Sequence, residues 1–133
     1  MRIYIAGSFV DQQALRPEMD RVWKTGHEVT GTWLNEVAKP AGMDDITFQK
    51  KLAIKDLCEV ARADVVILDN RRSSGGKNVE WGFALGEFQH KQLWLIGAPS
   101  TVFHHLADHT FAGWDECIYW LAELSKGGKN EVE

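Results

Sequence analysis

Cysteine, proline and long apolar runs are all scarce in this sequence. Its 133 residues include two cysteines and three prolines, without a low-complexity tract or an internal repeat. No apolar run approaches the roughly 20 residues that a transmembrane helix needs, and Met1 leads directly into a short apolar segment instead of a signal peptide. We therefore expect one globular domain over residues 1–125, a frayed tail over residues 126–133 and no membrane partner.

Positive charge is also in short supply. Fifteen Lys plus Arg stand against 19 Asp plus Glu, which gives a formal net charge of −4. This balance argues against a nucleic-acid polymer as partner, although it does not exclude a small phosphorylated ligand. The cysteines, Cys58 and Cys117, do not form a disulfide framework, so we expect a reducing, cytoplasmic setting.

Tryptophan, by contrast, is plentiful, with six residues in this short chain. Aromatic residues gather in subunit interfaces and also stack on flat ligands. The tryptophans therefore indicate either an interface or a ring-binding site.

The hydrophobic pattern alternates between strand and helix along the chain. Predicted strands cover residues 2–6, 27–33, 63–69 and 92–96, and predicted helices cover residues 11–25, 47–61, 77–90 and 114–124. The unbroken apolar run from Val65 to Leu68 is typical of a central parallel strand. The alternation predicts an α/β fold: a single open parallel sheet, flavodoxin-like or Rossmann-like, of about five strands with helices on both faces.

The first two predicted helices each have an apolar stripe. In the helix over 11–25 the stripe consists of Leu15, Met19, Val22 and Trp23. In the helix over 47–61 the main stripe consists of Ile54, Leu57, Cys58 and Ala61, while a second face carries Phe48, Leu52 and Asp56. We expect the main stripes to face the core.

Two loops follow predicted strands where open parallel sheets bind ligands, beyond the carboxyl ends of the strands. The first is Gly7-Ser8, and the second spans residues 70–76. In the second loop, two hydroxyls and two glycines precede a helix start, an arrangement suited to an anion; they are Ser73, Ser74, Gly75 and Gly76. The segment matches neither a Walker A loop nor a dinucleotide fingerprint.

Three carboxylates and one tyrosine are candidates for chemistry. Glu80 lies in the first turn after the glycine loop, and Asp56 lies on a helix. Residue type alone favours ordinary roles for both, a helix-start glutamate and a solvated aspartate. Asp69, at the carboxyl end of the third strand, fits ligand contact and a structural role equally well. Tyr4 lies within the first predicted strand, where the alternative to a chemical role is a packed tyrosine with its hydroxyl hydrogen-bonded.

Three histidines, His104, His105 and His109, are close in sequence but lack the spacing and context of a metal site. No cysteine pair with ligand spacing supports them. We expect neither a metal nor a cofactor.

Several short motifs occur in order along the chain: Tyr4-Ile5-Ala6-Gly7-Ser8, Lys55-Asp56-Leu57, Ala63-Asp64-Val65-Val66, Gly76-Lys77-Asn78-Val79-Glu80-Trp81-Gly82-Phe83-Ala84-Leu85 and Lys91-Gln92-Leu93-Trp94-Leu95-Ile96. In this order they resemble the nucleoside 2-deoxyribosyltransferase family. Together they extend over residues 2–97. The most specific part is the order Asp56, Asp64, Glu80 combined with the Val-Glu-x-Gly-x-Ala-Leu block.

The resemblance implies cleavage of the N-glycosidic bond of a nucleoside or nucleotide. It assigns Glu80 as the nucleophile that forms a glycosyl ester, Asp56 as the group that assists proton transfer to the departing base, and Tyr4 as the residue that orients the nucleophile. The chemistry agrees, because a nucleobase leaves poorly unless it is protonated. Members of the family are typically oligomers, so the resemblance also implies a homodimer or a higher homo-oligomer.

Position 74 departs from the transferases of this family, which place an aspartate there. Ser74, together with Gly7-Ser8, looks closer to the branch that hydrolyses 2-deoxynucleoside 5′-monophosphates, since hydroxyls accept a phosphate that a carboxylate would repel. Substrate contacts are then expected from Gly7, Ser8, Asp69, Ser73, Ser74, Gly75 and Gly76. Trp33 is either a stacking partner for the base or a packed or interface residue.

Three alternatives stay open. The first is a nucleoside 2-deoxyribosyltransferase that exchanges bases, and the second is an inactive nucleotide-binding module, against which the presence of both Asp56 and Glu80 argues. The third is a cytokinin-activating phosphoribohydrolase, whose Gly-Gly-x-Gly-Thr-x-x-Glu motif is only half met because Asn78 replaces a glycine.

Overall fold

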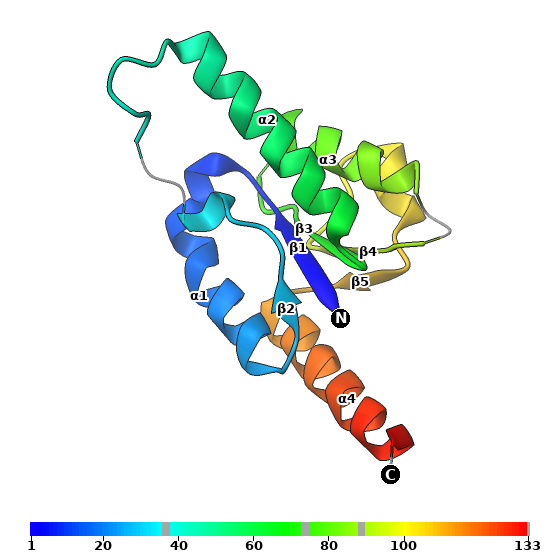
Figure 1. Cartoon of the computed structure of the whole chain (residues 1–133). Helices are drawn as coiled ribbons and strands as arrows, with labels where there is room; N and C mark the ends of the chain where they lie inside the picture. Colours follow the sequence, from blue (N-terminus) through cyan, green and yellow to red (C-terminus); the bar gives the residue numbers. More distant parts are fainter. Residues whose placement is uncertain (36–37, 73–74, 88–89, 133) are drawn as a thin grey trace.

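The computed structural model describes residues 1–35, 38–72, 75–87 and 90–132 (Figure 1). Within these residues five strands form one sheet in the order β2-β1-β3-β4-β5, and every neighbouring pair is parallel. The strands are β1 (Arg2–Ala6), β2 (Glu28–Val29), β3 (Val65–Asp69), β4 (Gln92–Ile96) and β5 (His109–Phe111). The predicted fold, a single open parallel sheet of about five strands, is confirmed.

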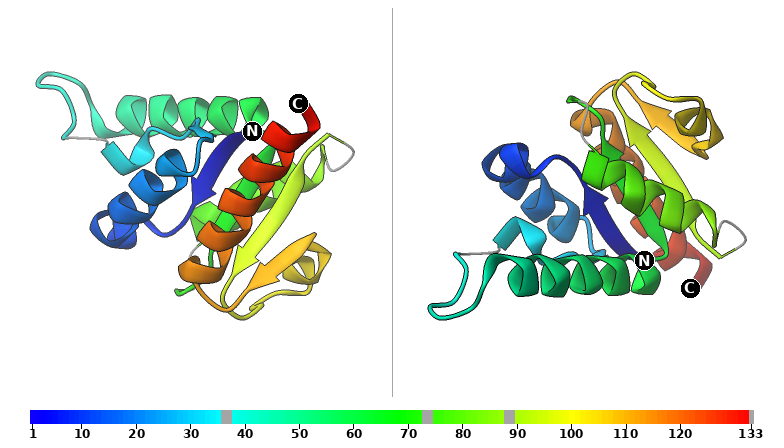
Figure 2. Two further views of the ribbon diagram at one scale, coloured as in Figure 1. Left: turned by 90° about the horizontal axis from the view of Figure 1, so that it is seen from below. Right: turned by 90° about the horizontal axis from the view of Figure 1, so that it is seen from above.

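Helices cover both faces of the sheet, also as predicted. In the described part of the chain the α-helices are α1 (Gln12–Lys24), α2 (Asp45–Arg62), α3 (Gly75–Leu85) and α4 (Trp114–Val132). Helix α1 packs beside α4 on one face, and α2 packs beside α3 on the other (Figure 2). Short 3-10 helices add η1 (Phe9–Asp11), η2 (Trp33–Asn35) and η3 (Val102–Leu106).

The strand order places a topological switch point between β1 and β3. From β1 the chain moves outward to β2, and from β3 it moves in the opposite direction to β4 and β5. All five residues of β3 are buried, because β1 and β4 flank it and helices cover both of its faces. The expected central strand is therefore confirmed, and a ligand crevice is expected where β1 and β3 end.

The second strand is shorter than its pattern predicts. Residues 27–33 read as a strand, but only Glu28–Val29 pairs with β1. One further backbone bond, from Thr30 N to Ile3 O at 2.8 Å, follows, and side-chain bonds then hold the segment. Thr30 Oγ1 donates to Glu59 O at 3.1 Å, and Trp33 Nε1 donates to Ile5 O at 2.7 Å.

The fifth strand, β5, was not located by sequence. It pairs with β4 through only three residues, from His109 to Phe111. A segment this short contains too little alternation to be recognised as a strand.

The predicted apolar stripes of two helices are partly wrong. Ile54 on α2 is 65% exposed, and Cys58 and Ala61 on the same stripe are also exposed. Trp23 on α1 is 64% exposed, although Leu15 on that stripe is fully buried. Apolar spacing identifies a face of a helix, but it does not tell which face the tertiary structure covers.

A buried carboxylate explains the orientation of α2. Glu59 is buried and accepts hydrogen bonds from Thr32 N at 3.2 Å and from Thr32 Oγ1 at 2.8 Å. Next to it, Val60 is fully buried. Because a buried carboxylate needs donors, this contact fixes the rotation of the helix. The second face, which carries Asp56, then points inward.

Two helices end at other residues than predicted. Helix α3 ends at Leu85, well before residue 90. Helix α4 continues to Val132, beyond the predicted end at residue 124. Ser125 Oγ donates to Thr25 O at 2.6 Å, which holds α4 against the end of α1 past the predicted boundary. None of the helices in the described residues is both long and apolar enough to cross a membrane.

Candidate active site

A cavity of about 850 Å³ lies at the carboxyl end of the sheet, beside the switch point. It is bordered by segments that follow β1 and β2 and by helices α2 and α3. Among the described residues, its wall includes Gly7, Ser8, Phe9, Val10, Trp33, Ala38, Lys39, Phe48, Gln49, Leu52, Ala53, Asp56, Gly76, Lys77 and Glu80. The rule for open parallel sheets therefore located the cavity correctly.

Asp56 and Glu80 reach this cavity from different helices. Asp56 comes from α2 and Glu80 from α3, and both are half-buried in its wall. Tyr4 on β1 is completely buried and does not line the cavity. Burial raises the pKa of the Tyr4 hydroxyl, and the negative charges of Glu80 and then Asp56 raise it further. The three residues thus form one electrostatic group, in which Tyr4 stays protonated.

Helical spacing brings Asp56 to the cavity. Phe48, Leu52 and Asp56 follow one another at steps of four, and all three line the wall. Helix α2 begins at a side-chain cap, because Asp44 Oδ1 accepts from Thr47 N at 2.8 Å. One helix therefore supplies both an apolar wall and a carboxylate.

Trp33 and Gly7 close the opposite side. Trp33 is 5% exposed, and its indole N–H is bonded to the Ile5 carbonyl, so the ring is held in one orientation in the wall. A Cβ atom on Gly7 would lie 2.6 Å from Leu15 Cδ1 and 3.7 Å from the Trp33 ring. A side chain at position 7 would therefore force the buried Leu15 side chain to move, so glycine is what allows this close packing beside the cavity.

Only some of the residues predicted to bind an anion line the cavity. Ser8 and Gly76 line the wall, whereas Gly75 begins α3 and does not. N–H groups in the first turn of a helix have no intrahelical acceptor, so the start of α3 offers donors to an anion. Ser73 and Ser74 lie outside the described residues.

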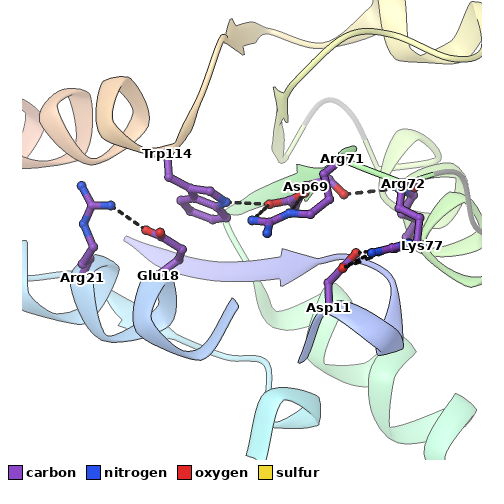
Figure 3. Close-up of polar contacts among 8 residues, drawn as sticks. All are labelled: Asp11, Glu18, Arg21, Asp69, Arg71, Arg72, Lys77 and Trp114. Atoms are coloured by element: carbon purple, nitrogen blue, oxygen red, sulfur yellow. Dashed lines mark hydrogen bonds and ion pairs between the residues drawn. The ribbon is translucent and has the colours of Figure 1, made fainter. Parts of the chain in front are cut away.

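Asp69 does not line the cavity. Its carboxylate accepts from Arg71 N at 3.0 Å, from Arg71 Nε at 2.9 Å and from Trp114 Nε1 at 2.7 Å (Figure 3). Burial by itself would raise the pKa of Asp69, but the bonds from Arg71 and Trp114 outweigh burial and lower it. Asp69 thereby ties the end of β3 to the start of α4.

Comparison with known proteins finds solved structures with the same fold. No family model matches the sequence, and no curated protein matches it. Solved structures do match. A 2-deoxyribosyltransferase from the psychrotolerant bacterium Bacillus psychrosaccharolyticus superposes with a TM-score of 0.70 at 16% identity, over 89% of this chain and 90% of that chain. The chain has the deoxyribosyltransferase fold.

A second solved structure shares the architecture. The CMP N-glycosidase BcmB of Clostridium botulinum superposes with a TM-score of 0.57 at 17% identity, over 91% of this chain and 98% of that chain. At these identities the two likenesses establish the fold and leave the activity to be argued from the site.

Sequence reasoning missed several residues of the site. The most unexpected is Lys77, which is 1% exposed and lines the cavity. Lysine is almost never fully buried, so the residue type gave no reason to expect Lys77 in the wall of a cavity. Gln49 and Ala53 were also missed, although they flank the stripe that carries Asp56 and could have been found from it.

The histidines have structural surroundings. His104 is buried, its Nδ1 accepts from Ser100 N at 3.0 Å, and its Nε2 lies 2.9 Å from Asn78 Oδ1. His109 contacts the Trp94 ring edge-on. Within the described ranges no three His, Cys, Asp or Glu side chains are grouped as metal ligands.

Proposed function

We propose that this protein cleaves the N-glycosidic bond of a 2-deoxynucleoside 5′-monophosphate and transfers the sugar to water. The observation that carries the proposal is the convergence of Glu80 and Asp56 on one cavity, with Tyr4 buried in the same electrostatic group. Two carboxyl groups in one wall are what a retaining glycosidic displacement requires.

In the first step, a Glu80 carboxylate oxygen attacks the anomeric carbon. The bond from that carbon to the base nitrogen breaks, its electron pair goes to the base, and Asp56 in its acid form protonates the base as it leaves. The product is a glycosyl ester on Glu80. Tyr4 stays neutral because its pKa is raised, so its hydroxyl can donate to the Glu80 carboxylate and orient it.

In the second step, water attacks the same carbon and the ester bond breaks. Asp56, now ionised, takes a proton from the water, and Glu80 leaves as a carboxylate. The sum of the two steps is one water consumed, with a free base and a sugar phosphate released. Neither step uses a cofactor.

The preference for a nucleotide rests on the segments after β1 and β3. Ser8 is buried in the wall beside Gly7, and Gly76 lines the wall at the start of α3. Hydroxyl and backbone N–H donors suit a phosphate dianion. The fold shared with the CMP N-glycosidase BcmB supports this reading, because that enzyme's name specifies a nucleotide.

The second candidate is transfer of the sugar to another base. The fold shared with the Bacillus psychrosaccharolyticus 2-deoxyribosyltransferase favours it. The two functions differ in the acceptor that attacks the glycosyl ester. Addition of a second free base to the reaction separates them, since a transferase exchanges bases faster than it hydrolyses substrate.

We also propose that the protein acts as a homodimer or higher homo-oligomer in the cytoplasm. Helices α2 and α3 pack together and present Ile54, Val79 and Phe83 to solvent, at 65%, 63% and 39% exposure. Exposed apolar side chains on these two helices support the proposal, because subunit interfaces bury residues of this kind. The cytoplasmic location is proposed from the sequence, whose two cysteines do not form a disulfide framework.

Release of free base, followed by chromatography, tests the proposed reaction. Wild-type protein is incubated with the four common 2-deoxynucleoside 5′-monophosphates and with the matching nucleosides. Glu80→Gln keeps the size of the side chain but removes the nucleophile, so turnover should fall to the background rate. Glu87→Gln, a half-buried glutamate outside the cavity wall, serves as the matched control and should keep wild-type turnover.

Two results would contradict the proposal. One is a Glu80→Gln variant with most of the wild-type rate, which would exclude Glu80 as nucleophile. The other is a wild-type protein that releases base from none of these compounds but binds them, which would leave the inactive nucleotide-binding module as the function.

A further inference from the structure

Lys77 is a buried lysine in the wall of the cavity, at the start of α3. It lies in the first turn of α3, between Gly76 and the helical turn that carries Glu80, and all three residues line the wall. Its ammonium donates to the carbonyl oxygens of Asp69, at 3.3 Å, and of Arg72. An ammonium has three N–H donors, so these two contacts leave one N–H over.

The positive charge of Lys77 is not neutralised by a neighbouring carboxylate. Figure 3 shows the two aspartates of this region, and each has its own arginine. Arg71 Nη2 lies 2.8 Å from Asp69 Oδ2, and Arg72 Nη2 lies 3.0 Å from Asp11 Oδ1. Among the described residues, Lys77 forms no ion pair within 4.0 Å.

A buried charge without a counter-charge is costly to the folded state. Burial lowers the pKa of Lys77, and the charges of Asp69 and Asp11 only partly oppose that effect. Lys77 therefore lies in the wall of an open cavity, at the positive end of a helix, and the two aspartates whose charges act on it are already paired with arginines.

A second buried lysine shows what a purely structural arrangement looks like. Lys91 is 7% exposed, and its ammonium also donates to two carbonyls, Ala61 O at 2.7 Å and Ala63 O at 2.6 Å. It differs from Lys77 in two respects. Glu87 lies 4.0 Å away as a counter-charge, and the residue precedes β4, at the opposite end of the sheet from the cavity.

We propose that Lys77 determines specificity for phosphorylated substrates, as the counter-charge of the substrate's 5′-phosphate. This inference rests on the proposed function and adds the cation that the serines and glycines of the anion site lack. The phosphate would receive the remaining ammonium N–H together with donors from Ser8 and the start of α3. An unphosphorylated nucleoside would leave the charge of Lys77 uncompensated.

The first test compares kcat/KM for a nucleotide and for the matching nucleoside. Lys77→Gln is neutral but keeps N–H donors for the two carbonyls. It should lose on the order of 10- to 100-fold on the nucleotide, the usual effect of one charge-assisted bond, with little change on the nucleoside. Lys77→Arg should restore most of the nucleotide preference, and Lys91→Gln should leave the ratio unchanged. Equal losses on both substrates would instead mean that Lys77 only supports the loop or Glu80, and would overturn the proposal.

The second test does not depend on turnover. Calorimetric titration with inorganic phosphate should show saturable binding to the wild-type protein and to Lys91→Gln, and much weaker binding to Lys77→Gln. If Lys77→Gln does not fold, Lys77→Met, which keeps an unbranched stem, takes its place. A wild-type protein that binds phosphate but releases no base would refute the proposed reaction and leave the role of Lys77 standing. A wild-type protein that does not bind phosphate would overturn the role of Lys77.

Discussion

Replacement of Asp69 by asparagine should destabilise the protein without changing substrate affinity. The substitution keeps the shape of the side chain, removes its charge and turns one acceptor oxygen into a donor nitrogen. Asp69 Oδ2 accepts from Trp114 Nε1 at 2.7 Å and from Arg71 Nη2 at 2.8 Å, so these bonds are lost if the amide nitrogen takes that position. The other oxygen retains the backbone N–H of Arg71.

The expected loss follows from the exposure of each partner. Trp114 is only 7% exposed, so its bond to a carboxylate contributes about 1.5–3 kcal/mol. The Arg71 side chain is 39% exposed, so solvent limits its pair to at most about 1 kcal/mol. We therefore expect the free energy of unfolding to fall by about 1.5–4 kcal/mol, a large part of the roughly 5–15 kcal/mol of a typical domain.

Urea unfolding of four proteins measures this loss: the wild type, Asp69→Asn, Trp114→Phe and the double variant. Trp114→Phe removes the indole N–H and keeps an aromatic ring, so the cycle isolates the bond between the two side chains. The folded Asp69→Asn protein should keep the KM of the wild type, because Asp69 does not line the cavity. A loss below about 1 kcal/mol, or an unchanged stability with a KM raised about tenfold, would refute the structural role and restore Asp69 as a substrate contact.

Two further predictions concern the acid and a buried histidine. Asp56→Asn should lower kcat by roughly 10²–10⁴-fold for natural bases but much less for a base that leaves without protonation, and equal losses would make Asp56 a positioning residue. Burial, and then Lys77, lowers the pKa of His104, so its contribution to stability is complete above the ordinary pKa of about 6.5 and is lost as pH falls toward the lower folded value. Unfolding free energies at about pH 7.5 and about pH 5.5 should therefore differ less in His104→Asn than in the exposed control His105→Asn, and equal differences would contradict this assignment.

Sequence patterns predicted the sheet because its determinants are local. The run Val65–Leu68 is apolar at every position, which is typical of a strand buried on both faces. The orientation of α2 could not be predicted, since it depends on Thr32 donating to Glu59 across the molecule. Pattern reasoning placed Ile54 inside, where the structure has it exposed.

The candidate site divides in a similar way. Asp56, Glu80, Gly7, Ser8, Trp33 and Gly76 were named from sequence, and all of them line the cavity. They were predicted from the order of the motifs and from their positions just after the ends of strands. Lys77 could not be found, because nothing local shows that its ammonium is buried against two carbonyls. The role of Asp69 was undecided for the same reason, since its partner Trp114 is remote in sequence.

The division of the cavity between α2 and α3 has an evolutionary consequence. The candidate nucleophile, Glu80, and the proposed anion-binding turn belong to α3, whereas much of the apolar wall consists of Phe48, Leu52 and Ala53 on α2. These wall residues come from one helix and can change size without altering the turn that holds Glu80. A lineage with this fold can therefore acquire new ligand preferences by substitutions within two turns of a single helix, while its reaction chemistry is inherited intact.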